Sequence, residues 1–381
     1  MSGTPNIFAF ATKELSQDAF ICWLVSWVNC DENPAMQRCG REFVALLYNT
    51  FQKTFKAADE ISADQVTNVE NLRQQYLHID VYFQSLIAGR RVSFVIEDKT
   101  HTTHHSGQLQ RYKKRVQDDE EHEDETVLIY FKMGFLHTWD KLAADEGYAI
   151  VDYELFQEFL DAHETNDYLF ESYKGFARET YYLPYKERFP RLLRGEDTAL
   201  FGHWHVQWQF MQELQSRLAD LGESAAVDCS ITDTGSLYSG SNRGGSWWTE
   251  LRFVTVPRVY GEVEESVFYR VDWRKDAYYL AIRQYAGIEK GGEHAPAKLE
   301  RLATYRSAFD SVKDAQGEEP LAFGKPSTDN VGNKESEIAV VFFDSGTNSP
   351  QRVLDKITPM HAAFVGSIRQ SGLVPPSTPE T

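Results

Sequence analysis

Two acidic side chains near residue 90 could together bind a divalent cation. The segments 77–83 and 92–99 are rich in β-branched and aromatic residues, which predicts two strands joined by a turn at residues 88–89. If the strands pair outward from that turn, Asp80 lies directly opposite Glu97. Directly opposed Cβ atoms lie roughly 4.5–5.5 Å apart, a distance that one divalent cation can bridge.

A lysine lies on the same face of the second strand. Side chains alternate along a strand, so Glu97 and Lys99 share a face while Asp98 points away, and His78 lies opposite Lys99. The apolar run 94–96 indicates a strand buried on both faces, where two ionised carboxylates repel each other unless a cation joins them. The alternative is a charge cluster on a solvated face, and we favour the metal site.

A polar loop and a basic helix follow the second strand. Ser106 is a suitable N-cap for a helix that runs from about residue 107 to residue 116. Gln108, Tyr112 and Arg115 are spaced at i, i+4 and i+7 and therefore share one face of this helix. The positive N-terminal end of the helix is expected near the predicted metal site, where it would stabilise a phosphate.

Together these features resemble the PD-(D/E)XK nuclease superfamily, especially its RecB-like and lambda-exonuclease-like branch with a Gln-x-x-x-Tyr helix. The matching residues, in the order of the family motifs, are Asp80, Glu97-Asp98-Lys99, and Gln108 with Tyr112. The segment 6–18 also resembles the first helix of a largely uncharacterised bacterial group in that superfamily. The resemblance covers about the first 165 residues, and Ile79 replaces the proline of the family name, which carries no chemistry.

The resemblance implies metal-assisted hydrolysis of a phosphodiester bond. Asp80 and Glu97 would hold one or two Mg²⁺ ions, for which Mn²⁺ could substitute, and the backbone carbonyl of Asp98 would add a ligand. Lys99 would orient or help deprotonate the attacking water, and Glu14 on the first helix would be a further acid of the site. For Glu14 the alternative is a first-turn residue that stabilises the helix dipole. The residues expected to bind substrate are Gln108, Arg111, Tyr112, Lys114 and Arg115. For Gln108 and Tyr112 the alternative is that their side chains cover the sheet.

Several other potential ligands are expected to have structural roles. Asp18, one helical turn after Glu14, is expected at the surface or in a capping network. The three histidines within residues 101–105 lack the spacing and the partner acids of a zinc site, so they predict a solvated loop. The four cysteines show no Cys-x-x-Cys spacing, which indicates neither zinc nor disulfides and agrees with a reducing cytosol.

The net charge of −18 argues against a free-standing, tight nucleic-acid binder, because a polyanion is repelled at long range. Basic residues are nevertheless concentrated within 111–115, beside the predicted site. The segment 118–125 then carries seven acidic residues in eight positions, which predicts a solvated loop. The alternative is a segment that competes with substrate or binds a basic partner. This balance of acidic and basic residues favours weak or gated nuclease activity over constitutive, tight binding of nucleic acid.

A length of 381 residues predicts more than one domain. We expect an α/β (α+β) protein in which residues 1–165 form a restriction-endonuclease-like core with a mixed sheet flanked by helices. A helical connector (166–200), an α+β domain (201–370) and a disordered tail (371–381) would follow. The segment 19–28 is too short to span a bilayer, and the N-terminus does not have the pattern of a cleavable signal. We therefore expect a cytoplasmic protein without membrane contact.

Two functions are compatible with these features. The favoured one is a Mg²⁺-dependent nuclease that acts on DNA, in the bacterial restriction or anti-phage setting that the resemblance implies. The alternative is a catalytically silent, nuclease-like protein that binds a basic protein through its acidic surface. The second domain would serve recognition, oligomerisation or sensing, so a homo-oligomer or an activating protein partner is expected. In that domain, Trp247, Trp248, Trp273 and Tyr278 are candidates for stacking on bases or for the core, and Arg283 could mark a diverged, inactive copy of the catalytic hairpin.

Overall fold

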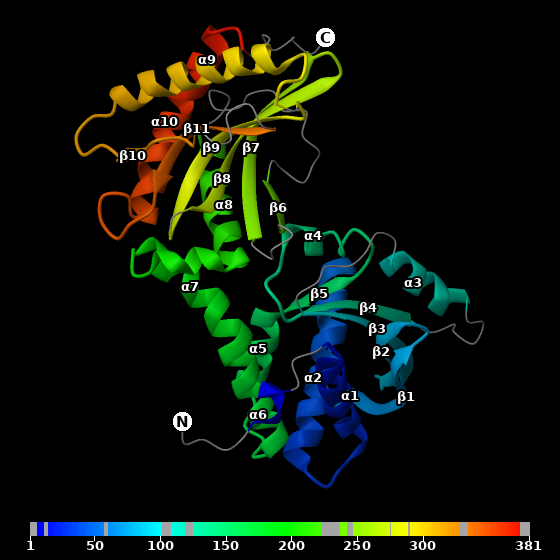
Figure 1. The fold of residues 1–381 in the computed structure, drawn as a ribbon. Helices are drawn as coiled ribbons and strands as arrows, with labels where there is room; N and C mark the ends of the chain where they lie inside the picture. Colours follow the sequence, from blue (N-terminus) through cyan, green and yellow to red (C-terminus); the bar gives the residue numbers. More distant parts are fainter. Residues whose placement is uncertain are drawn as a thin grey trace. The chain divides into compact units, whose positions relative to one another are not determined.

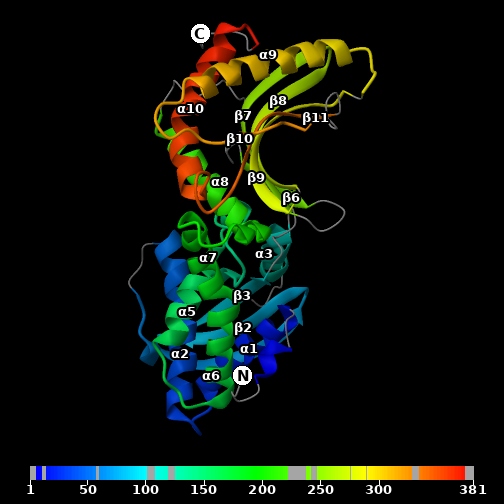
Figure 2. The same ribbon diagram turned by 60° about the vertical axis from the view of Figure 1, so that its left-hand side comes forward.

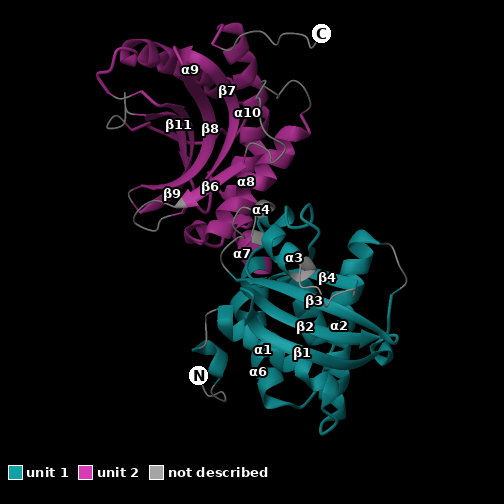
Figure 3. Cartoon of the chain, turned by 90° about the vertical axis from the view of Figure 1, so that its right-hand side faces the viewer, with its two compact units in different colours: residues 1–185 teal, residues 186–381 magenta. Residues whose placement is uncertain are grey.

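The computed structural model divides the chain into two compact units, residues 1–185 and 186–381 (Figure 3). The described residues are 6–10, 14–56, 60–100, 108–118, 125–221, 237–241, 247–274, 276–288, 290–327 and 334–373. One unit contains a mixed sheet and the other an antiparallel sheet, each flanked by helices, which confirms the predicted mixed α/β class (Figure 1). Among the described helices, none is both long and apolar enough to cross a membrane.

The first unit is built on a five-stranded sheet with the order β1-β2-β3-β4-β5. Strands β1, β2 and β3 are antiparallel to one another, whereas β4 and β5 run parallel to β3. Its elements are α1 (Glu14–Ser26), α2 (Pro34–Phe55), β1 (Val66–Tyr76), β2 (Ile79–Ile87), β3 (Arg90–Lys99), α3 (Gln108–Asp118), β4 (Glu125–Lys132), α4 (Thr138–Lys141), β5 (Ala149–Asp152), α5 (Tyr153–Asp161) and α6 (Tyr168–Ala177).

The register of the β2–β3 hairpin is the one that the sequence predicts. Val81 pairs with Ile96, and Ile87 pairs with Arg90 beside the turn. The two turn residues, Ala88 and Gly89, have φ values of 49° and 77°, as a two-residue hairpin turn that matches the twist of the strands requires. This pairing brings Asp80 and Glu97 to neighbouring strands at the end of the hairpin that lies away from the turn.

The start of β2 differs from the prediction. Leu77 and His78 have φ values of 54° and 69° and form the turn between β1 and β2, so the expected strand position of His78 opposite Lys99 is wrong. Strand β1 is not predicted from the sequence either, because this edge strand is half-exposed and rich in polar residues such as Asn, which has little preference for strands.

Helices α1 and α2 pack against one face of this sheet, and α3 lies on the other side (Figure 3). A close approach between α1 and α2 depends on Gly40 of α2, where an added Cβ would lie 2.7 Å from the backbone oxygen of Leu24. Helix α1 contacts β1, β2 and β3, so it can bring side chains to the strands that carry the predicted site.

The segment 166–200 is helical, as expected for a connector, but it is divided between the two units. Helix α6 belongs to the first unit, and the boundary falls within α7 (Leu183–Leu193). The second unit then contains α8 (Trp204–Ala219), β6 (Leu237–Ser241), β7 (Trp247–Tyr260), β8 (Val263–Arg274), β9 (Ala277–Ala286), α9 (Ala295–Asp314), β10 (Phe323–Gly324), β11 (Glu335–Phe342) and α10 (Pro350–Gln370).

The elements of the second unit fit the α+β class that the sequence predicts for residues 201–370. Residues 374–381 of the expected tail lie outside the described residues. The sheet order is β10-β11-β9-β8-β7-β6, and all described pairs are antiparallel.

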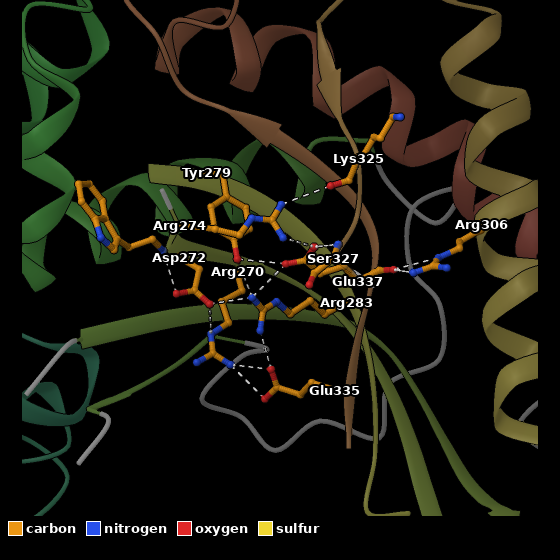
Figure 4. A network of polar contacts seen from close by, with 11 residues as sticks. Arg270, Asp272, Arg274, Tyr279, Arg283, Arg306, Lys325, Ser327, Glu335 and Glu337 are labelled. Atoms are coloured by element: carbon orange, nitrogen blue, oxygen red, sulfur yellow. Dashed lines mark hydrogen bonds and ion pairs between the residues drawn. The ribbon is translucent and has the colours of Figure 1, made fainter. Parts of the chain in front are cut away.

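Helices α8, α9 and α10 cover one face of this curved sheet (Figure 2). A charged cluster lies on the other face, where Arg270 and Arg283 both bind the carboxylate of Glu335, at 3.0 and 2.7 Å (Figure 4). Arg283 also binds Asp272 at 2.7 Å. The described pairs of this sheet are all antiparallel and none corresponds to β3–β4, so they do not support the idea of a diverged copy of the first unit. Arg283 belongs to an ion-pair network with Asp272 and Glu335.

Candidate active site

Three oxygen atoms surround the ammonium group of Lys99 at the end of β3. The nearest is Glu97 Oε1 at 2.5 Å, followed by the backbone oxygen of Asp98 at 2.9 Å and Asp80 Oδ2 at 3.6 Å. The backbone N–H of Asp98 also donates to Asp80 Oδ2 at 2.9 Å. The structure thus brings together the three residues at the centre of the predicted site.

Burial makes this cluster electrostatically unusual. Glu97 is fully buried and Lys99 is 8% exposed. Burial, followed by the charge of Asp80, raises the pKa of Glu97 to about 8, although the Lys99 ammonium opposes the shift. Burial lowers the pKa of Lys99, but Glu97 and Asp80 outweigh this effect and raise it above its ordinary value. Lys99 is therefore charged at neutral pH and stabilises negative charge on its neighbours.

The donor atoms of this cluster fit a hard divalent cation. Two carboxylates and one backbone carbonyl converge on a position where a positive charge, the Lys99 ammonium, already lies. In the described part of the chain, no group of three or more His, Cys, Asp and Glu side chains could hold a metal. A bound ion would therefore keep several water ligands, as Mg²⁺ does at sites with one or two carboxylates.

The side chain of Asp98 points away from Glu97, as strand alternation predicts. It is fully buried beneath α1, where its Oδ1 accepts a hydrogen bond of 2.5 Å from Gln17 Nε2. Glu14, also on α1, accepts a hydrogen bond of 3.1 Å from the backbone N–H of Thr100. The Glu14 carboxylate therefore lies at the end of β3, beside the residue that follows Lys99. There it adds to the negative potential around that lysine.

The prediction of a surface position for Asp18 is wrong. Asp18 is 1% exposed and lies on the buried side of α1, between Asp98 and β1. Burial, followed by the charge of Asp80, raises the pKa of Asp18 to about 6. The error arose because β1 was not predicted, and β1 supplies Gln75, whose Nε2 donates to Asp18 at 3.4 Å and to Asp80 at 3.0 Å.

The basic helix α3 is anchored to the same unit by its apolar face. Tyr112 is buried, and the hydroxyl of Tyr148 donates to the backbone oxygen of Leu109 at 3.1 Å. Arg115 donates to the backbone oxygen of Leu77, at 2.6 Å, in the turn before β2. The exposed side chains include two of the residues predicted to bind substrate, Arg111 and Lys114, whereas the side chain of Gln108 lies outside the described part.

A second buried lysine lies beside the site and was missed by the sequence analysis. Lys132 of β4 pairs in register with Lys99, and its Nζ lies 3.5 Å from Asp140 Oδ1. Tyr130 donates to the same Asp140 oxygen at 2.6 Å, and burial lowers the pKa of Lys132. The local sequence carries no signal for this lysine, because its position depends on the parallel register of two strands that are distant in the chain.

The remaining candidate ligands add no metal site to the described part of the chain. The histidines of residues 101–105 lie outside the described residues. Three cysteines are described, and all three, Cys22, Cys30 and Cys39, are free.

No protein-family model matches this chain, and no curated protein or solved structure matches it at a significant level. The resemblance to the PD-(D/E)XK superfamily therefore rests on the motifs in the sequence.

Proposed function

We propose that this protein is a metal-dependent nuclease that hydrolyses phosphodiester bonds, with DNA as the preferred substrate. The observation that carries the proposal is the convergence of three oxygens on Lys99 Nζ: the Glu97 carboxylate at 2.5 Å, the Asp98 carbonyl at 2.9 Å and the Asp80 carboxylate at 3.6 Å. Buried carboxylates with a charged lysine between them suit a reaction in which negative charge develops on a phosphate.

Each residue of the cluster has a distinct proposed role. Asp80, Glu97 and the carbonyl of Asp98 would hold Mg²⁺, and the ion would lower the pKa of bound water and neutralise charge on the phosphate. Lys99 donates to the attacking water or to the phosphate, and the surrounding acids keep it protonated for that purpose. Glu14 holds the end of β3 through Thr100 and so maintains the position of Lys99.

The surface of α3 supports nucleic acid as the substrate. Arg111 and Lys114 are exposed on this helix and can neutralise backbone phosphates. The net charge of −18 opposes long-range attraction to DNA, so we propose that activity is weak or gated by a partner. A role in bacterial restriction or defence against phage follows from the resemblance alone.

The proposal is tested by incubating circular DNA, linear DNA and RNA with the protein in the presence of Mg²⁺ or Mn²⁺. Cleavage should require the metal and should be lost in Asp80→Asn, which keeps the shape of the side chain but removes its charge. Glu70→Gln is the matched control, because Glu70 is a half-exposed acid of the neighbouring strand that faces Arg91. Absence of cleavage together with absence of metal binding would overturn the proposal.

One observation favours the alternative of a catalytically silent interaction protein. Most of the excess of acidic over basic residues lies in residues 1–185, the unit that carries the site, where it would attract a basic protein. In the digestion experiment, this alternative predicts no cleavage by the wild-type protein, with either metal and on any of the substrates.

The raised pKa of Glu97 predicts that metal affinity increases with pH. Burial and the charge of Asp80 favour the protonated form of Glu97 more than in an ordinary carboxyl group, so protons compete with a cation for this ligand as the pH falls. The apparent affinity for Mn²⁺ should therefore rise by up to about tenfold per pH unit from about pH 6, and should level off above the pKa. Calorimetric titration over this range checks the prediction, and an affinity independent of pH would contradict it.

A further inference from the structure

A glutamine on the edge strand β1 contacts both Asp80 and Asp18. Gln75 Nε2 lies 3.0 Å from Asp80 Oδ1 and 3.4 Å from Asp18 Oδ2. The amide nitrogen carries two hydrogens, so it can donate to both acids at once. The other orientation of the amide would direct its oxygen at two carboxylates, and the two contacts therefore fix which way it faces.

The hydrogen bond from Gln75 completes the set of donors that fix the orientation of the Asp80 carboxylate. One carboxylate oxygen of Asp80 already accepts a hydrogen bond from the backbone N–H of Asp98, at 2.9 Å. Gln75 donates to the other oxygen, so donors from two neighbouring strands hold both oxygens. The terminal torsion of an aspartate is otherwise broad, and two such donors restrict it to one orientation. That orientation keeps Oδ2 3.6 Å from Lys99 Nζ.

The backbone of Gln75 has an unusual conformation that serves this contact. Its φ of 56° lies in the left-handed region, which is strained for a residue with a side chain. Pairing continues on either side, with Gln74 opposite Val81 and Tyr76 opposite Ile79, so Gln75 lies opposite Asp80. Glycine would adopt this backbone without strain, but it would remove the donor between the two acids.

We propose that Gln75 is a positioning residue for metal binding, which orients the Asp80 carboxylate as a ligand and links it to Asp18 of α1. This inference rests on the proposed function, since it assumes that Asp80 binds the cation. Groups that orient metal ligands through hydrogen bonds contribute about 10–100-fold to metal affinity.

The test compares glycine substitutions at two left-handed positions of β1. Gln75→Gly should weaken Mn²⁺ binding about tenfold, measured by calorimetry or by the electron paramagnetic resonance of free Mn²⁺. Asn71→Gly is the matched control, since Asn71 has a φ of 51° and donates to Gln84 at 2.6 Å, outside the acidic cluster. It should leave Mn²⁺ binding unchanged. The melting temperature of both variants is measured as a control for folding, because glycine relieves left-handed strain but also removes a side-chain hydrogen bond.

Two further variants separate the possible outcomes. Gln75→Met retains the length of the side chain and the strained backbone but lacks the donor, and it should weaken Mn²⁺ binding as Gln75→Gly does. Asp80→Asn should abolish Mn²⁺ binding. If the wild-type protein binds Mn²⁺ and Asp80→Asn does not, equal binding by wild type and the Gln75 variants would overturn the positioning role alone. Absence of Mn²⁺ binding by the wild-type protein would instead overturn the proposed function.

Discussion

Replacing Lys99 with methionine should lower the rate of phosphodiester cleavage by about 10²–10³-fold while metal binding is retained. The ammonium is the positive charge that lies among Asp80, Glu97 and the Asp98 carbonyl. Its removal takes away a stabiliser of the developing negative charge and, at the same time, a competitor for the two carboxylates. Affinity for Mn²⁺ should therefore be unchanged or higher in Lys99→Met, whereas the initial rate on plasmid DNA falls.

The comparison of activity with metal affinity distinguishes a chemical role from a structural one. Lys56→Met is the matched control, because it removes the same charge from an exposed ion pair with Glu125 and should leave cleavage unchanged. Wild-type activity in Lys99→Met would contradict the role of the lysine. A joint loss of activity, Mn²⁺ binding and thermal stability would show that Lys99 acts by holding the site together.

Replacing Glu265 with alanine should destabilise the second unit by about 3–5 kcal/mol. Glu265 is fully buried between the sheet and α9, where Arg301 donates two hydrogen bonds to it, at 2.8 and 2.6 Å. Tyr305 donates to the same oxygen, at 2.8 Å. Tyr260 and Gln284 donate to the other oxygen, each at 2.6 Å. Removal of this carboxylate takes the acceptor of two hydrogen bonds from the partly buried Arg301 guanidinium, which still donates to the backbone oxygen of Leu373 at 2.7 Å, and one acceptor from each of three further polar groups.

Denaturation in urea, followed by tryptophan fluorescence, measures this loss. Glu262→Ala is the control, because Glu262 is 91% exposed and its nearest basic partner, Arg258, lies 3.8 Å away. This control should leave the transition unchanged. If Glu265→Ala unfolds at the same urea concentration as the wild-type protein, the carboxylate does not organise the unit as the hydrogen bonds indicate.

The β2–β3 hairpin could be predicted because its determinants are local. A two-residue turn at Ala88 and Gly89 sets the register, and a strand period of two then assigns Glu97 and Lys99 to one face and Asp98 to the other. The helix α3 was predicted for the same reason, since helical periodicity is visible within a few neighbouring residues.

The residues that hold the site in place could not be predicted, because they come from segments that are distant in the chain. Asp18 and Gln75 are 57 residues apart in the chain, and they meet only because α1 packs across an edge strand with a polar sequence. The left-handed backbone at Gln75 lies within a regular stretch of the β1–β2 pairing, and no local pattern of residues indicates it. The position of Lys132 beside Lys99 likewise depends on a parallel pairing between strands separated by α3.

The sequence by itself therefore determined the α/β class, the hairpin and the acidic and basic residues at its end, because turn chemistry and side-chain alternation act between neighbours. The tertiary structure alone decided which residues hold those side chains in place, namely Gln17, Asp18 and Gln75 around the site and the partners of Glu265 in the second unit. The physical reason is burial: a buried charge requires partners in three dimensions, and the chain supplies them from whichever elements pack there.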